Sequence, residues 1–120
     1  MNKSEWLKAL IFSYLSTEAV LDKKVIYEVF DFLKEKGIIT GGSDFSTDWL
    51  GQCESYYRGL RFKQTEPTLG VVAICASRLQ QASQFIRQSP AHAHVADKFL
   101  ALSQQCQQIV NADAIELELV

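Results

Sequence analysis

Charged and hydrogen-bonding side chains gather in one short stretch of the chain, between Cys53 and Gln64. The candidate contact residues there are Glu54, Ser55, Arg58, Arg61 and Lys63. Guanidinium groups suit bidentate hydrogen bonds with phosphate or with guanine, and a lysine suits phosphate. The carboxylate would be repelled by phosphates unless it accepts a hydrogen bond from cytosine. This chemistry indicates nucleic-acid contacts; the alternative is a solvated helix face.

The overall charge gives little help to such contacts. The 120 residues include 12 Lys and Arg against 14 Asp and Glu, a formal net charge of −2. Many DNA-binding domains carry a basic excess that releases counterions from the phosphates. Any basic footprint must therefore be local, and the acidic balance favours a protein partner as the alternative.

Other residue types that do chemistry are present without a convincing arrangement. His92 and His94 lie beside Asp97, but residues two apart on a helix point in different directions, so a shared metal is not expected. No nucleophile has a recognisable partner spacing, and no glycine-rich phosphate loop is present. We expect a binding protein rather than an enzyme, with no cofactor and no metal.

Three widely spaced cysteines indicate the compartment. Cys53, Cys75 and Cys106 are odd in number and lack a zinc-binding spacing, which suits a reducing environment. No apolar run approaches the roughly 20 residues of a membrane span, and the N-terminus lacks a signal-peptide profile. The expected location is the cytoplasm, with no membrane partner.

The elements that must position these residues are predicted to be helices throughout. With 48% apolar residues, the chain is expected to form one all-α domain over residues 1–120. The apolar spacing predicts helices over about 4–15, from 21 to a stop at Gly37, over a short segment ending at Leu50-Gly51, and over 53–62, 68–88 and 95–109. The tail, 114–120, alternates apolar and acidic residues as a short strand would.

The middle helices have the order of a helix-turn-helix. Gly51 would permit the tight turn, and Pro67 suits the first turn of the helix that follows. The predicted core of the motif is Leu50, Leu60, Leu69, Val72 and Ala76. One ring of the Tyr56-Tyr57 pair is expected to join it.

These residues resemble the lambda-repressor-like (Cro/C1-type, XRE-like) helix-turn-helix regulators over roughly residues 21–79. The shared features are Leu50-Gly51, Tyr56-Tyr57, Leu60, Pro67-Thr68-Leu69, Ala76 and Leu79. Two features depart from that pattern: Ser46-Thr47 stands where Leu-Ala is usual, and Cys53 stands where a serine cap is expected. The segment from Trp49 to Tyr57 also resembles small uncharacterised bacterial proteins with a Trp-Leu-Gly…Ser-Tyr-Tyr segment.

The resemblance implies a helix-turn-helix core about residues 21–79, an extra N-terminal helix and a C-terminal helical pair over about 68–110. It implies a DNA-binding transcriptional regulator of bacterial, phage or mobile-element type, whose partner is duplex DNA. A protein-interaction adaptor on the same fold is the alternative. A third, weaker possibility is a helical bundle that binds a small ligand in an apolar pocket.

A narrow apolar line runs along the last predicted helix. This C-terminal seam consists of Val95, Phe99, Leu102, Cys106 and Ile109. Steps of four and three are the spacing of a coiled coil, which predicts a homodimer contact. The alternative is that the seam covers the long helix over 68–88 within one chain.

Overall fold

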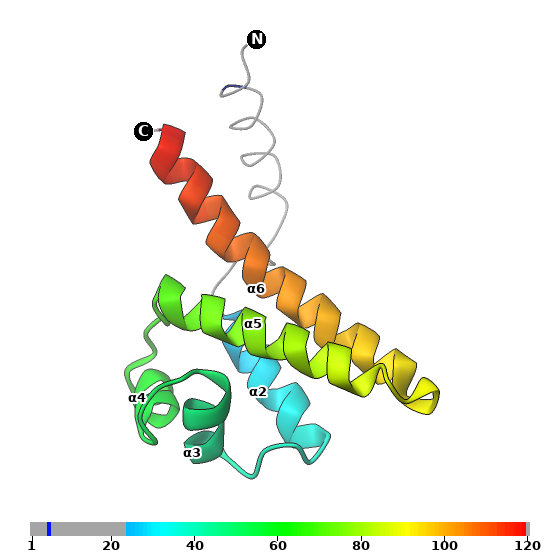
Figure 1. The fold of residues 1–120 in the computed structure, drawn as a ribbon. Helices are drawn as coiled ribbons and strands as arrows, with labels where there is room; N and C mark the ends of the chain where they lie inside the picture. The colour runs from blue at the N-terminus through cyan, green and yellow to red at the C-terminus, as the bar shows by residue number, and fades with distance from the viewer. Residues whose placement is uncertain (1–4, 6–23, 120) are drawn as a thin grey trace.

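The structure is a computed structural model that describes Glu5 and residues 24–119, and this part of the chain is helical without a strand (Figure 1). Its elements are α2 (Val25–Glu35), α3 (Gly42–Asp44), the π-helix η2 (Phe45–Trp49), α4 (Tyr56–Lys63), α5 (Leu69–Ile86), the 3-10 helix η3 (Pro90–His92) and α6 (Ala93–Leu119). The predicted all-α class is confirmed. The helix expected over residues 4–15 lies outside the described residues, except for Glu5.

The prediction of a strand in the tail is wrong, because α6 continues to Leu119. A helix that has already formed gains one backbone hydrogen bond for each residue it adds, using only its own chain. A strand would instead need a neighbouring strand, and the described residues contain none. The alternation of apolar and acidic residues therefore does not decide the local structure here.

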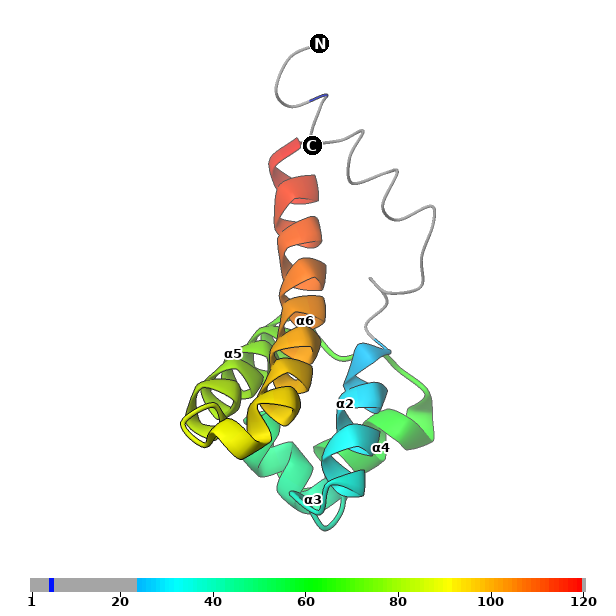
Figure 2. The same cartoon turned by 90° about the vertical axis from the view of Figure 1, so that its right-hand side faces the viewer.

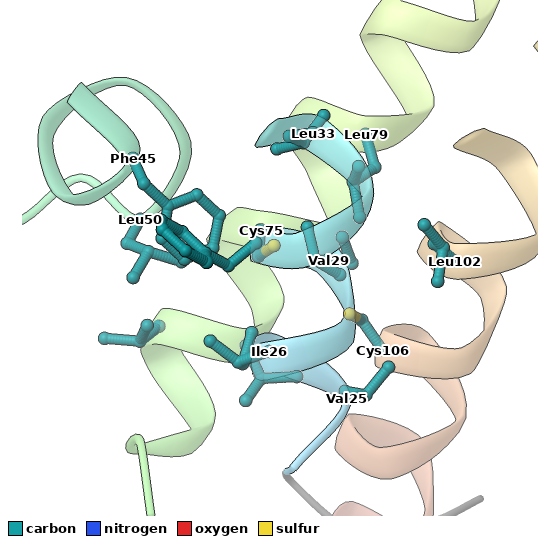
Figure 3. Packing of buried hydrophobic residues seen from close by; sticks show 14 of the residues in the cluster. Val25, Ile26, Val29, Leu33, Phe45, Leu50, Cys75, Leu79, Leu102 and Cys106 are labelled. Carbon is teal, nitrogen blue, oxygen red and sulfur yellow. The ribbon is translucent and has the colours of Figure 1, made fainter. Parts of the chain in front are cut away.

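The core forms where α2, α5 and α6 meet. Figure 3 shows side chains of this core from all three helices, among them Val29 of α2, Leu79 of α5 and Leu102 of α6. The α5 helix packs against the first part of α6, whereas the C-terminal end of α6 extends beyond α5 and points away from α3 and α4 (Figures 1 and 2). α3 and α4 lie together on one side of the core that α2, α5 and α6 form (Figures 1 and 2). The candidate contact residues are in α4 and in the turn before it.

The C-terminal seam lies inside this single chain. Its four residues from Phe99 to Ile109 are buried, and Val95 is half-buried. The ring of Phe99 packs edge-on against Phe32 of α2, with the centroids 5.2 Å apart, and lies 6.1 Å from the Trp49 ring of η2. The predicted homodimer contact through the seam is therefore wrong, because these side chains already cover α2 and α5.

Buried hydroxyl groups also join α5 to α6. The Oγ of Ser103 donates to the Ala76 carbonyl oxygen at 2.6 Å, and the Oγ of Ser83 donates to the Ala96 carbonyl oxygen at 2.8 Å. Each hydroxyl is buried, and each finds an acceptor on the facing helix. These bonds fix the register of the two helices in addition to their apolar contact.

Four of the five residues that were predicted to be buried together are buried. Leu50, Leu60, Val72 and Ala76 are buried together in the main cluster, and Leu69 is partly buried against it. The turn glycine, Gly51, has a φ of +65°, a conformation that favours glycine.

Candidate nucleic-acid interface

The helix that carries most of the candidate contact residues begins later than its sequence suggests. α4 starts at Tyr56, not at Cys53, so Glu54 and Ser55 lie in the turn before it. Ser55 takes the N-cap position, but its side chain makes no capping hydrogen bond. The Tyr56 N–H donates to the nearby Cys53 carbonyl oxygen at 3.1 Å, whereas the Tyr57 N–H needs an acceptor from elsewhere in the fold.

That acceptor is Ser46, in the preceding helix. Its Oγ accepts from the Tyr57 N–H at 2.9 Å and donates to the Gly42 carbonyl oxygen at 2.6 Å. Ser46 is fully buried. Sequence reasoning treated this serine as a departure from an apolar pair and missed its role. The local pattern could not reveal a partner eleven residues away.

A second polar contact fixes the turn between η2 and α4. Arg78, on α5, donates from one Nη atom to the carbonyl oxygens of Thr47 and Asp48, at 2.9 and 2.6 Å. These carbonyls lie near the end of η2, where backbone acceptors lack partners within the helix. Sequence reasoning did not single out Arg78, because nothing in its own helix indicates these acceptors.

The inner side of α4 is anchored by Tyr57. Its ring stacks on Phe30 with a centroid distance of 4.4 Å and meets Phe45 edge-on at 4.9 Å. Burial raises the pKa of the Tyr57 hydroxyl to about 12, so the group is neutral at physiological pH. Tyr56 is half-buried, and the expectation that one ring of the pair joins the core is confirmed.

An open groove of about 560 Å³ lies between α4 and α3. Four of the five candidate contact residues line it, and α3 supplies the opposite wall. The lining residues are Glu54, Ser55, Arg58 and Arg61, with Gly42 and Ser43 across from them and Phe30 and Tyr57 beneath. The structure thus brings two guanidinium groups, two hydroxyl groups and one carboxylate to a single hollow surface.

Lys63 does not belong to this group. It is exposed but does not line the groove. At roughly 100° per residue, it lies about 140° around the helix axis from Arg58 and about 200° from Arg61. The two arginines therefore share a face of α4, and the lysine points away from it.

Two exposed residues of the stretch from Cys53 to Gln64 were not among the candidates. Phe62 has 88% of its surface exposed, the largest value among the exposed large apolar residues. Cys53 is an exposed free thiol 3.6 Å from the Ser55 hydroxyl, whose hydrogen bond lowers the pKa of the thiol. A helical-wheel projection of this segment would have identified Phe62 from the sequence as the apolar residue that faces outward.

The histidine pair lies elsewhere. Both are exposed: His92 ends η3, and His94 lies in the first turn of α6. The neighbouring Asp97 carboxylate pairs with Arg87 at 2.7 Å. This ion pair joins α5 to α6 at the surface.

In the described part of the chain, no helix combines the length and the apolar character needed to cross a membrane. No curated protein and no solved structure matches the chain. A family model described as "Family of unknown function (DUF6626)" matches residues 26–119, which include every element from α2 to α6 except the first residue of α2. Because this match covers more than half of the sequence, the chain belongs to the DUF6626 family.

Proposed function

We propose that this chain is a small DNA-binding protein that places α4 against the major groove of duplex DNA. The observation that carries the proposal is the groove along α4, where Arg58, Arg61 and two serine hydroxyls are exposed on one side. The same helix is anchored in the core through Leu60 and through Tyr57, whose buried ring lies beneath the groove. A helix held in this way can present its outer side to a ligand without losing its own packing.

Each group in the groove has a partner on DNA. Arg58 and Arg61 supply charge-assisted hydrogen bonds to phosphates or to guanine, and the hydroxyls of Ser43 and Ser55 suit phosphate oxygens. The order of a short helix, a glycine turn and a second short helix is the order in which helix-turn-helix proteins dock. Regulation would follow by occlusion or recruitment at a promoter, in a bacterial, phage or mobile-element setting.

The test is duplex binding by an Arg58→Ala, Arg61→Ala double variant. Fluorescence anisotropy with bulk duplex DNA at low salt should show binding by the unchanged protein and at least a 10-fold weaker affinity for the variant, since two charged contacts are lost. The matched control is Lys36→Ala with Lys98→Ala. It also removes two positive charges, one at the C-cap of α2 and one on α6, and both positions lie outside the groove.

Three results decide between the hypotheses. Weakened binding in the arginine variant alone supports the proposal. Equal weakening in both variants indicates a non-specific charge effect and contradicts this placement of the site. If the unchanged protein binds no duplex at low salt, the chain is not a DNA-binding protein.

Phe62 favours a second candidate function, that of a protein-interaction adaptor. Exposed aromatic and arginine side chains are enriched at protein interfaces, and Phe62 is exposed on the same helix as Arg58 and Arg61, although it does not line their groove. The net charge of −2 agrees with this alternative. Phe62→Ala should then abolish the association with a protein partner, whereas Phe85→Ala, which removes a ring that is 74% exposed on α5, should not.

A further inference from the structure

One acidic residue, Glu54, lines the groove together with Arg58. Glu54 and Arg58 are four residues apart, and both are exposed and line the groove. Glu54 lies in the turn before α4, so the side-chain pairing that a four-residue spacing favours within a helix is not imposed here. Among the described residues no ion pair joins the Glu54 carboxylate to the Arg58 guanidinium, so each is available to a ligand.

A carboxylate in a DNA-binding groove restricts what can lie opposite it. A phosphate placed against Glu54 would be repelled. The favourable DNA partner in the major groove is an exocyclic amino group, and the amino group at N4 of cytosine is the one that Glu and Asp accept from. Arg58, four residues further on and in the first turn of α4, suits the O6 and N7 atoms of guanine.

We propose that Glu54 and Arg58 read sequence: Glu54 accepts from a cytosine N4 amino group while Arg58 donates to a guanine within two base pairs of it. The inference rests on the proposed DNA binding and adds the class of site that α4 recognises. Arg61 and the serine hydroxyls then serve as backbone contacts, which position the helix without reading bases.

Glu54 also has a purely structural explanation. It precedes the first turn of α4, where a negative charge interacts favourably with the helix dipole. Under that explanation its removal lowers the melting temperature and leaves base preference unchanged. Under the proposal, the removal of the Glu54 carboxylate changes the base preference. A structural role alone would not produce that change.

The experiment selects sequences from a pool of duplexes with a randomised central segment, using the full chain. The unchanged protein should enrich a cytosine and a guanine within two base pairs. Anisotropy on the selected duplex should then show about 10-fold weaker binding when that cytosine is replaced by thymine. Glu54→Gln should lose this discrimination at the cytosine position only, and Arg58→Lys should lose it at the guanine position only.

Glu66→Gln is the matched control. It removes one exposed carboxylate from the loop after α4, outside this groove, and should keep both preferences. If Glu54→Gln tightens binding to all duplexes alike and keeps the cytosine preference, the carboxylate does not read bases and this inference fails while DNA binding stands. If the unchanged protein binds no duplex, the proposed function fails, and the inference fails with it.

Discussion

The hydroxyl of Ser46 is the residue-level feature on which α4 depends most directly. Replacing Ser46 by alanine removes the acceptor of the Tyr57 N–H and leaves this buried donor without its partner. We expect Ser46→Ala to lower the free energy of unfolding by about 1–3 kcal/mol. Urea unfolding followed by circular dichroism measures this change.

Ser77→Ala is the control for this prediction. Ser77 is exposed on α5, so its replacement should change the stability by no more than about 0.5 kcal/mol. A Ser46→Ala variant as stable as the control would show that water replaces the hydroxyl as the acceptor.

Asp44 makes stability depend on pH. Its carboxylate accepts from the Thr40 N–H at 2.7 Å, from the Gly41 N–H at 3.0 Å and from the Thr40 hydroxyl at 3.1 Å. These hydrogen bonds lower the pKa of Asp44 below its usual value of 3.8, and the bond from the Thr40 amide has the largest effect. The ionised form is therefore favoured in the folded state.

The stability that Asp44 contributes is complete above the pKa of the unfolded chain and is lost as the pH falls through the lower, folded-state pKa. We expect the unchanged protein to be more stable than Asp44→Asn near pH 7, and this difference to shrink as the pH falls below about 4. Urea midpoints at several pH values test the trend. A difference that stays constant down to pH 2 would contradict it.

At the scale of elements, Arg78 connects α5 to the turn before α4. Arg78→Met keeps most of the length and apolar character of the side chain but loses the donors to the Thr47 and Asp48 carbonyls. We expect a loss of about 1–3 kcal/mol in the free energy of unfolding. Chemical denaturation measures it, and an unchanged midpoint would mean that solvent satisfies both carbonyls.

The packing of α6 on α2 and α5 gives a further prediction. Leu102 is buried in the seam, so Leu102→Ala should lower the free energy of unfolding by about 2–5 kcal/mol, and Leu102→Glu should unfold the protein. Gln104→Ala, at an exposed neighbouring position, is the control. Circular dichroism with light scattering separates the outcomes, because a folded Leu102→Glu variant of lower molecular mass would indicate an intermolecular seam instead.

The elements were predicted well where one face is apolar and poorly where the outcome depends on distant partners. α2 and α5 follow from helical spacing, and Gly37 and Pro90 mark breaks as expected. The start of α4 was placed three residues early because the cap comes from another helix. The seam has a coiled-coil spacing, but spacing does not say whether the partner helix belongs to the same chain.

At the scale of the whole molecule, the charge distribution limits how DNA binding can depend on salt. The chain has a net charge of −2, and among the described residues the two groove arginines are the positive charges at the candidate interface. Because Arg58 is proposed to contact guanine, Arg61 is left to contact a phosphate. Each phosphate contact contributes a slope of about −0.9 to the logarithm of the affinity against that of the salt concentration. We expect a slope of about −1 for the unchanged protein.

The arginine double variant should have a slope near zero, and a binding series from low to moderate salt measures both values. A slope of about −5 or steeper in the unchanged protein would place further cations at the interface.

The candidate contact residues themselves were found from residue type and spacing in one stretch. Their grouping around one groove could be seen only in the folded structure. The way α3 and α4 face each other brings Ser43 into the lining of the groove and leaves Lys63 out of it.

The borrowed cap of α4 has a consequence for the cooperativity of the fold. Helices shorter than about 12–15 residues are marginal in water, and α4 has eight residues and no capping bond from its own N-cap side chain. Its amides should therefore exchange with deuterium through a local opening that also releases η2, at a lower free energy than the amides of α5. A ligand in the groove would slow this exchange selectively. The recognition surface would then be the part of the molecule that unfolds first, and a destabilising substitution at Ser46 or Arg78 would weaken binding without touching the ligand.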